Sequence, residues 1–150
     1  MKDFEERFLN KEDAFDIVAL EKSSFKNPWP LSQIEYELLE NPCSKVIGIY
    51  SEGVLQAYLD FMITFDSATI NRIAVKEGAR RKGLASKLLK KMEEICLGNE
   101  DKVETITLEV RKSNIAAHSL YLKMGYQDIT IKKMYYDDGE DAIYMMRSLL

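Results

Sequence analysis

One segment near the middle of the chain limits most strongly what the chain can fold into. Residues 70–75 (INRIAV) form an apolar strand-like run, and residues 83–97 carry leucines and other apolar side chains at helical spacing before Gly98. The short basic turn 80–85 (RRKGLA) joins the two patterns. A strand that passes through a short turn into an amphipathic helix indicates a β-α-β unit, and therefore a mixed α/β fold.

Local signals divide the rest of the chain into further strands and helices. Asn10 is a helix N-cap candidate, Ser32 with Glu35 has capping-box spacing, and Glu52-Gly53 is typical of a hairpin turn. The predicted strands are 3–8, 45–50, 54–65, 68–76, 103–111, 126–136 and 142–148, and the predicted helices are 11–24, 33–40, 83–97 and 114–124. We therefore predict one mixed α/β domain over residues 1–150, with a βαβ unit among antiparallel neighbours.

Composition excludes several classes of protein. The 150 residues are 46% hydrophobic and 31% charged, and no apolar run is long enough to cross a bilayer. The net charge of −4 argues against direct nucleic-acid binding but is compatible with a basic peptide as partner. An acidic N-terminus and two cysteines without metal-type spacing favour a cytoplasmic protein without a metal.

The basic turn suits a phosphate group physically. Unpaired backbone N–H groups and the helix dipole favour negative charge there, and the small residues Gly83 and Ala85 let a ligand approach the backbone. The alternative is a plain helix start with a solvated basic edge.

Two polar side chains downstream are candidates for chemistry. Strand 103–111 alternates, so that Glu109 lies on its polar face and Leu108 on its apolar face. Tyr121 lies on the next helix, which begins at Asn114. Each has an ordinary alternative, namely a solvated glutamate and a tyrosine that only packs.

At this point the chain resembles a known family. The turn has the Arg-x-x-Gly-x-Ala pattern of the GNAT acyltransferases. The further matching stretches are 25–29 (FKNPW), 72–75 (RIAV), 108–114 (LEVRKSN), 120–126 (LYLKMGY) and 135–145 (YYDDGEDAIYM). Within the superfamily they are similar to the RimI group, the ribosomal-protein-alanine N-acetyltransferases.

The resemblance implies a fold, a co-substrate and residue roles. The GNAT fold has a central, mixed but mostly antiparallel sheet of about seven strands with about four helices. In the family, the residue matching Glu109 is the general base and the residue matching Tyr121 is the general acid that protonates the CoA thiolate. The residues implied to bind acetyl-CoA are Ile73, Ala74, Val75, Arg80, Arg81, Lys82, Gly83, Leu84, Ala85, Ser86 and Asn114.

The implied reaction is acetyl transfer to the N-terminal α-amine of a small-subunit ribosomal protein, with alanine as the first residue. An α-amine with a pKa near 8 is roughly a tenth neutral at pH 7, whereas a lysine is neutral well below about one part in a thousand. Acetylation of a lysine or a small amine, and a non-catalytic acyl-CoA-binding module, remain alternatives. The sequence leaves the oligomeric state open.

Three other features have open interpretations. His118 is either a surface residue or a second candidate acid beside Tyr121. The acidic tip 137–141 either attracts a basic peptide or is a solvated turn. Trp29, between two prolines, either walls a peptide pocket or anchors its loop to the core.

Overall fold

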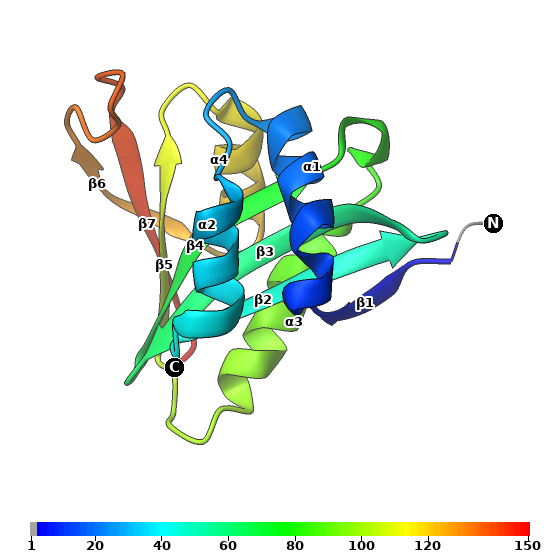
Figure 1. The fold of residues 1–150 in the computed structure, drawn as a ribbon. Coiled ribbons are helices and arrows are strands. Elements are labelled where there is room, and N and C mark those ends of the chain that lie inside the picture. The colour runs from blue at the N-terminus through cyan, green and yellow to red at the C-terminus, as the bar shows by residue number, and fades with distance from the viewer. Residues whose placement is uncertain (1–2) are drawn as a thin grey trace.

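A computed structural model describes residues 3–150 as a seven-stranded sheet with helices on both faces (Figure 1). The strands are β1 (Glu5–Phe8), β2 (Ser44–Ser51), β3 (Val54–Thr64), β4 (Ser67–Val75), β5 (Thr105–Arg111), β6 (Gln127–Lys132) and β7 (Ala142–Ser148). The helices are α1 (Ala14–Ser24), α2 (Leu31–Glu35), α3 (Leu84–Leu97) and α4 (Ile115–Lys123). None of the helices in residues 3–150 is long and apolar enough to cross a membrane.

The strand order is β1-β2-β3-β4-β5-β7-β6, and every neighbouring pair is antiparallel except β4 with β5. The parallel pair is the one joined through α3, as a βαβ unit requires. The predicted mixed, mostly antiparallel sheet with four helices is therefore confirmed.

Local signals explain most of the element boundaries. Glu52 and Gly53 have positive φ angles of 52° and 77°, the backbone twist that a two-residue hairpin needs between β2 and β3. Asn10 accepts a hydrogen bond from the N–H of Glu12, and Asp13 accepts one from the N–H of Asn10. This capping box precedes a short 3₁₀ turn that leads into α1, as predicted from Asn10.

Two predicted elements were wrong in detail. The capping box at Ser32 does not form, because Pro30 is the extended residue before the helix and α2 already begins at Leu31. The helix continues as a π-helical turn over Tyr36–Glu40. The strand predicted over 126–136 ends at Lys132, and Met134 has a φ of 50°, which is outside strand geometry.

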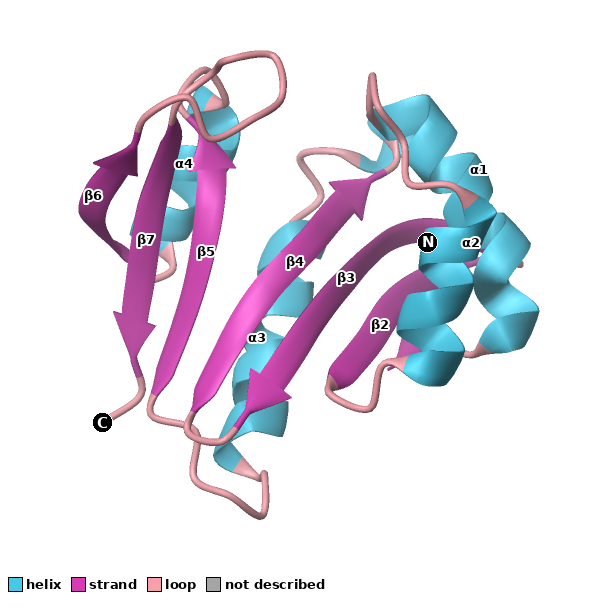
Figure 2. Ribbon diagram, turned by 60° about the vertical axis from the view of Figure 1, so that its left-hand side comes forward, coloured by secondary structure: helices cyan, strands magenta, loops and turns pink. Residues whose placement is uncertain are grey.

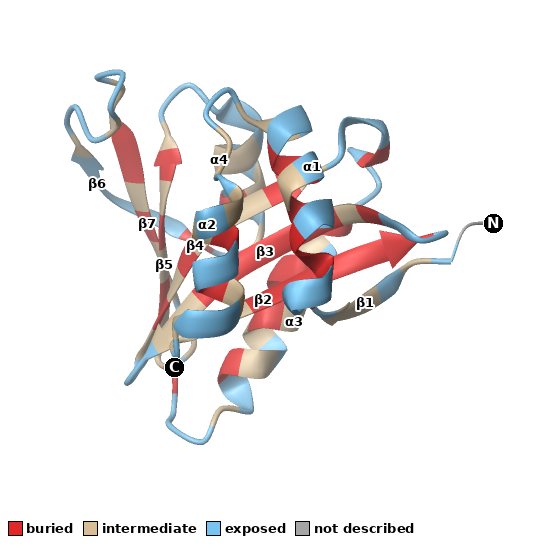
Figure 3. Ribbon diagram, viewed as in Figure 1, coloured by how far each residue is buried: buried red, intermediate tan, exposed pale blue. Residues whose placement is uncertain are grey.

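The two faces of the sheet are covered unequally. Helices α1 and α2 lie over β2, β3 and β4, and α3 and α4 lie on the opposite face (Figures 1 and 2). A larger buried cluster joins the sheet to α3 and α4, and a smaller one joins it to α1 and α2 (Figure 3). Within residues 3–150, no helix lies over the face of β5, β7 and β6 that continues the α1–α2 side.

The sheet opens between its two central strands. Strand β4 pairs with β5 only where Ser67–Thr69 meets Thr105–Thr107, and the two strands then diverge (Figure 2). Over Ile70–Val75, β4 pairs only with β3. We call this region the β4–β5 wedge: the part of β4 that does not pair with β5, together with the facing part of β5 beyond Thr107.

Candidate active site

The strand alternation predicted for β5 places Glu109 on the uncovered face. Its neighbours Leu108 and Val110 point into the larger core and are buried, while the Glu109 side chain keeps 19% of its exposure. A partly buried carboxylate beside the β4–β5 wedge is accessible to a ligand without being fully solvated. It can accept a proton from an amine at this position.

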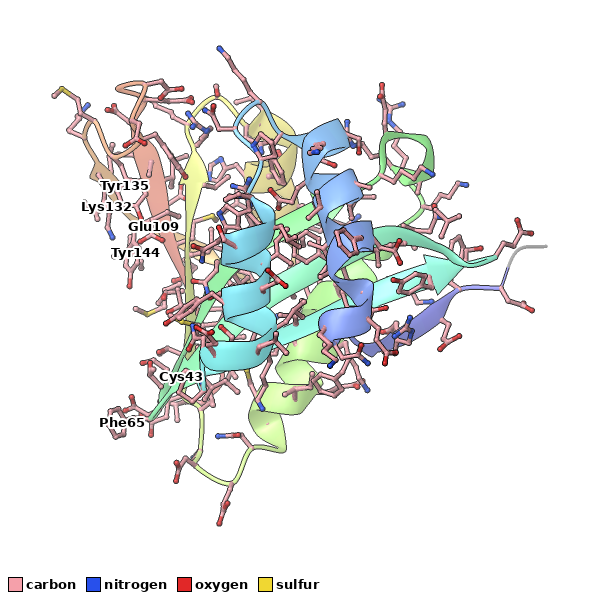
Figure 4. All side chains as sticks on the ribbon, in the orientation of Figure 1. Cys43, Phe65, Glu109, Lys132, Tyr135 and Tyr144 are labelled. Carbon is pink, nitrogen blue, oxygen red and sulfur yellow. The ribbon has the colours of Figure 1, made fainter. Side chains whose placement is uncertain are left out.

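Glu109 is not free, however, because Lys132 binds it. The Lys132 ammonium donates to Oε1 of Glu109 at 2.7 Å, and this hydrogen bond is the main cause that raises the pKa of Lys132. The ammonium also lies 4.6 Å from the ring centroid of Tyr144 and 5.4 Å from that of Tyr135. Figure 4 shows the four side chains gathered on the β5–β7–β6 side.

Sequence reasoning missed this arrangement. In the sheet register Lys132 lies opposite Ala142, and Tyr144 lies directly opposite Glu109. Opposite residues share a face, so Lys132 crosses the small Ala142 side chain toward β5. Alternation could place Lys132 on a face, but only the order β5-β7-β6 brings it to Glu109.

Tyr121 lies on the other side of β5 from Glu109. It is 4% exposed within the larger core and packs edge-to-face on Tyr126, with 5.7 Å between ring centroids. Burial, and secondarily the nearby Tyr136, raises the pKa of the Tyr121 phenol. The phenol therefore stays protonated at neutral pH, which is the state that a general acid needs.

Tyr136 lies near both predicted catalytic residues. It is close enough to Tyr121 to raise the pKa of that phenol, and close enough to Glu109 for the carboxylate to raise its own. Burial raises the pKa of Tyr136 to about 12, against the opposing effect of Arg111, whose guanidinium lies 4.0 Å from the ring centroid. No hydrogen bond joins Glu109 to Tyr121 within residues 3–150, and the two side chains lie on opposite sides of β5.

The basic turn has the backbone of an anion-binding nest. Arg81 and Gly83 have φ angles of 67° and 76°, and Gly83 is the N-cap residue of α3 without a side-chain capping bond. Alternating backbone of this kind turns successive N–H groups toward one side. Arg80 donates to the backbone oxygen of Val75 at 3.2 Å. Within residues 3–150, none of the three basic side chains of the turn has a carboxylate partner within 4.0 Å.

The remaining predicted cofactor residues follow the wedge. Ile73 and Val75 pack against the larger core, and Ala74 packs in the smaller one, so the part of β4 that does not pair with β5 is held firmly. Leu84 is buried and anchors the start of α3, where Ala85 and Ser86 are partly exposed. These residues and the turn thus form one continuous edge.

Asn114 has a structural task in addition to its predicted one. Its side-chain oxygen accepts a hydrogen bond from the N–H of Ala117 at 3.2 Å and so caps α4. This helix carries Tyr121, so Asn114 fixes the start of the element that positions the predicted acid.

The features left open by the sequence all have partners inside the chain. The ring Nε2 of His118 lies 2.7 Å from Oδ1 of Asp128. Arg111 binds Asp138 and Glu140 in the acidic tip, and Lys133 binds Asp141. The tip therefore offers less uncompensated negative charge than its sequence indicates.

Trp29 anchors its loop. Its backbone N–H donates to Glu21 at 2.7 Å, and the Arg72 guanidinium lies 5.1 Å from its ring centroid. The side chain is partly buried against the smaller core.

Comparison with known proteins identifies the family. A model of the acetyltransferase (GNAT) family matches residues 14–126. The chain belongs to the GNAT acetyltransferase family. It is an N-acetyltransferase of this type, and the resemblance seen in the sequence is confirmed.

Similar GNAT proteins cover nearly the whole chain. A Bacillus subtilis protein provisionally named a ribosomal protein bS18-alanine N-acetyltransferase is 39% identical over 140 residues, which are 93% of this chain and 91% of the relative. An N-alpha-acetyltransferase of Saccharolobus solfataricus is 30% identical over 99% of this chain and 95% of its own length.

Solved GNAT structures agree with this fold. The ribosomal-protein-S18-alanine N-acetyltransferase of Escherichia coli superposes with a TM-score of 0.86 at 28% identity, covering 98% of this chain and 94% of that one. NAA60 of Arabidopsis thaliana in complex with acetyl-CoA has a TM-score of 0.86 over 98% of this chain and 99% of its own, but its 14% identity shows a shared fold only.

Proposed function

We propose that the protein transfers the acetyl group of acetyl-CoA to the N-terminal α-amine of a protein, and that its acceptor is the N-terminal alanine of a small-subunit ribosomal protein. The observation that carries this proposal is the β4–β5 wedge, which lies between a basic nest and the Glu109 carboxylate. A cytoplasmic location goes with this acceptor.

The residues along the wedge fit acetyl-CoA chemically. The pyrophosphate would take the N–H groups and positive charges of the turn from Arg80 to Ser86. The amides of the pantetheine arm would pair with the backbone groups of Ile73–Val75 that face β5 and with the side chain of Asn114. The acetyl-CoA complex of the GNAT fold described above supports this choice of co-substrate.

The two predicted catalytic side chains then act at the end of that arm. The neutral amine attacks the thioester carbonyl, the C–S bond breaks, and the amine proton passes to Glu109. Tyr121 gives its proton to the departing thiolate. Glu109 and Tyr121 lie on opposite sides of β5. The acceptor amine would lie on the Glu109 side of the wedge, and the departing thiolate on the Tyr121 side.

Two observations support an α-amine as acceptor. Because an α-amine has a lower pKa than a lysine, a single carboxylate is an adequate base for it. The names of the Bacillus subtilis and Escherichia coli proteins specify an alanine of a ribosomal protein, and that of the Saccharolobus solfataricus protein specifies only an α-amine. The ribosomal acceptor therefore rests on the bacterial similarity.

Mass spectrometry of synthetic peptides tests the proposal. A peptide that begins with alanine and continues with basic residues should gain one acetyl group on its α-amine. The same peptide with a blocked α-amine and a free lysine should react poorly. Equal or faster acetylation of the blocked peptide would refute the α-amine assignment and leave the acetyltransferase assignment in place.

A further inference from the structure

Lys132 occupies a site that has the chemistry of an ammonium-binding cage. Its ammonium is 2.7 Å from the Glu109 carboxylate and lies near the rings of Tyr144 and Tyr135, at 4.6 Å and 5.4 Å from their centroids (Figure 4). A carboxylate combined with aromatic faces is the arrangement that binds primary and quaternary ammonium ligands. We call Glu109, Tyr135 and Tyr144 the ammonium cage.

Lys132 occupies the cage, whereas the neighbouring cations Lys133 and Arg111 bind other carboxylates. Lys133, the next residue, has a side chain that is 76% exposed and binds Asp141 in the hairpin tip instead. Lys132 reaches Glu109 over the small Ala142, across the intervening strand β7. The lysine therefore holds its ammonium at the carboxylate where an acceptor amine would have to lose its proton.

The lysine can leave this position. Its side chain is 39% exposed and has a flexible four-carbon stem, so it can rotate into solvent without disturbing the sheet. Partly exposed ion pairs and cation–π contacts are individually weak. Together they favour the position of the lysine in the cage over its position in solvent by a factor of about ten. A ligand that brings its own ammonium would restore both kinds of contact.

We propose that the ammonium cage binds the α-ammonium of the acceptor, and that Lys132 fills the cage until the acceptor displaces it. The inference rests on the proposed function, because it assigns the cage to the acceptor of that reaction. Lys132 then acts as an internal competitor: an amine without further contacts to the protein displaces it poorly, whereas a peptide that also binds along the uncovered face displaces it readily.

Peptide affinity in the presence of CoA, which cannot donate an acetyl group, gives the first test. Calorimetry should show that Lys132→Met binds an alanine-terminated peptide about 3- to 10-fold more tightly than the wild type. The matched variant Lys133→Met should leave the affinity unchanged. Neither substitution should change the affinity for the α-acetylated peptide. Unchanged or weaker binding of the free peptide by Lys132→Met would overturn the proposal, since a lysine that merely positions Glu109 would help binding.

A second test does not depend on the peptide. In Lys132→Met, methylammonium chloride should shift the ring resonances of Tyr135 and Tyr144, and the wild type should need a several-fold higher concentration. Sodium chloride at equal ionic strength should shift neither. Absence of a methylammonium shift in Lys132→Met would refute the cage. If methylammonium binds but no peptide is acetylated, the cage stands and the proposed acceptor is wrong.

Discussion

The Arg72 guanidinium donates hydrogen bonds of 2.9 Å and 2.7 Å to the two carboxylate oxygens of Glu21. Glu21 lies on α1 and is completely buried, and it also accepts hydrogen bonds from the Tyr58 hydroxyl and the Trp29 N–H. The guanidinium stacks on Phe25, 3.8 Å from the ring centroid. This one ion pair therefore ties α1 and the Trp29 loop to β4, at the border of the wedge.

We expect Arg72→Ala to lower the free energy of unfolding by about 3–5 kcal/mol, because it leaves the Glu21 charge buried without its main partner. Urea denaturation measures the change. Lys91→Ala, which breaks an exposed pair with Glu94, is the control and should cost no more than about 0.5 kcal/mol. If Arg72→Ala lowers the free energy of unfolding by a similarly small amount, solvent or another group compensates the charge of Glu21.

Gly83→Val should reduce CoA affinity at least tenfold while the protein stays folded. At a φ of 76°, valine is strained and its side chain would occupy the side of the nest where a phosphate must approach. Gly78→Val is the matched control, since a Cβ at Gly78 would also meet open space but Gly78 has no positive φ. If calorimetry gives the two variants the same CoA affinity, the pyrophosphate binds elsewhere.

Tyr121→Phe should lower kcat by roughly 10²–10⁴-fold with little effect on folding, because it removes only the proton donor from a packed ring. Tyr126→Phe keeps the same ring pair and should retain most of the activity. Steady-state kinetics compares the two. Wild-type turnover in Tyr121→Phe would assign proton donation to another group, with Tyr136 the next residue to test.

Asp60 makes stability depend on pH. Both of its carboxylate oxygens are buried without a hydrogen-bond partner in residues 3–150. Burial, together with the adjacent Glu37 carboxyl, raises its pKa to about 9 from 3.8, against the opposing effect of Asn71. The unfolded chain releases this proton near pH 4 and the folded protein keeps it to about pH 9. Stability contributed by this group is therefore lost as pH rises through that interval.

Asp60→Asn should accordingly stabilise the protein more at pH 8 than at pH 5, by up to about 1.4 kcal/mol per pH unit. Its amide cannot ionise and keeps the size of the carboxyl group beside Glu37. Denaturation at both pH values measures the difference, and the exposed Asp101→Asn provides the baseline. A stability difference that is constant between pH 5 and pH 8 would mean that Asp60 ionises normally.

Local patterns predicted the elements because their causes are local. The Glu52-Gly53 turn, the Asn10 cap and the alternation around Glu109 depend on neighbouring residues only. The Ser32 cap failed because Pro30 had a competing effect on the same helix start. Family resemblance, rather than periodicity, supplied the catalytic and cofactor roles, which remain predictions.

Long-range pairings were not predictable in the same way. Lys132 reaches Glu109 only because β7 lies between their strands, and Asp60 meets Glu37 only where a helix packs on β3. In each pairing, the two interacting side chains come from segments that are far apart in the sequence. Both sites depend on strand order and helix placement, which are properties of the assembled sheet.

The early end of the β4–β5 pairing has a consequence for how a ligand would change the protein's dynamics. Three residue pairs join the two halves of the sheet directly, so backbone amides beyond Thr69 that face β5 have no strand partner and should exchange with solvent quickly. A ligand arm with its own amides would act there as a missing strand and slow that exchange. Hydrogen exchange along β4 would thus report occupancy of the wedge residue by residue, before any acetyl group has moved.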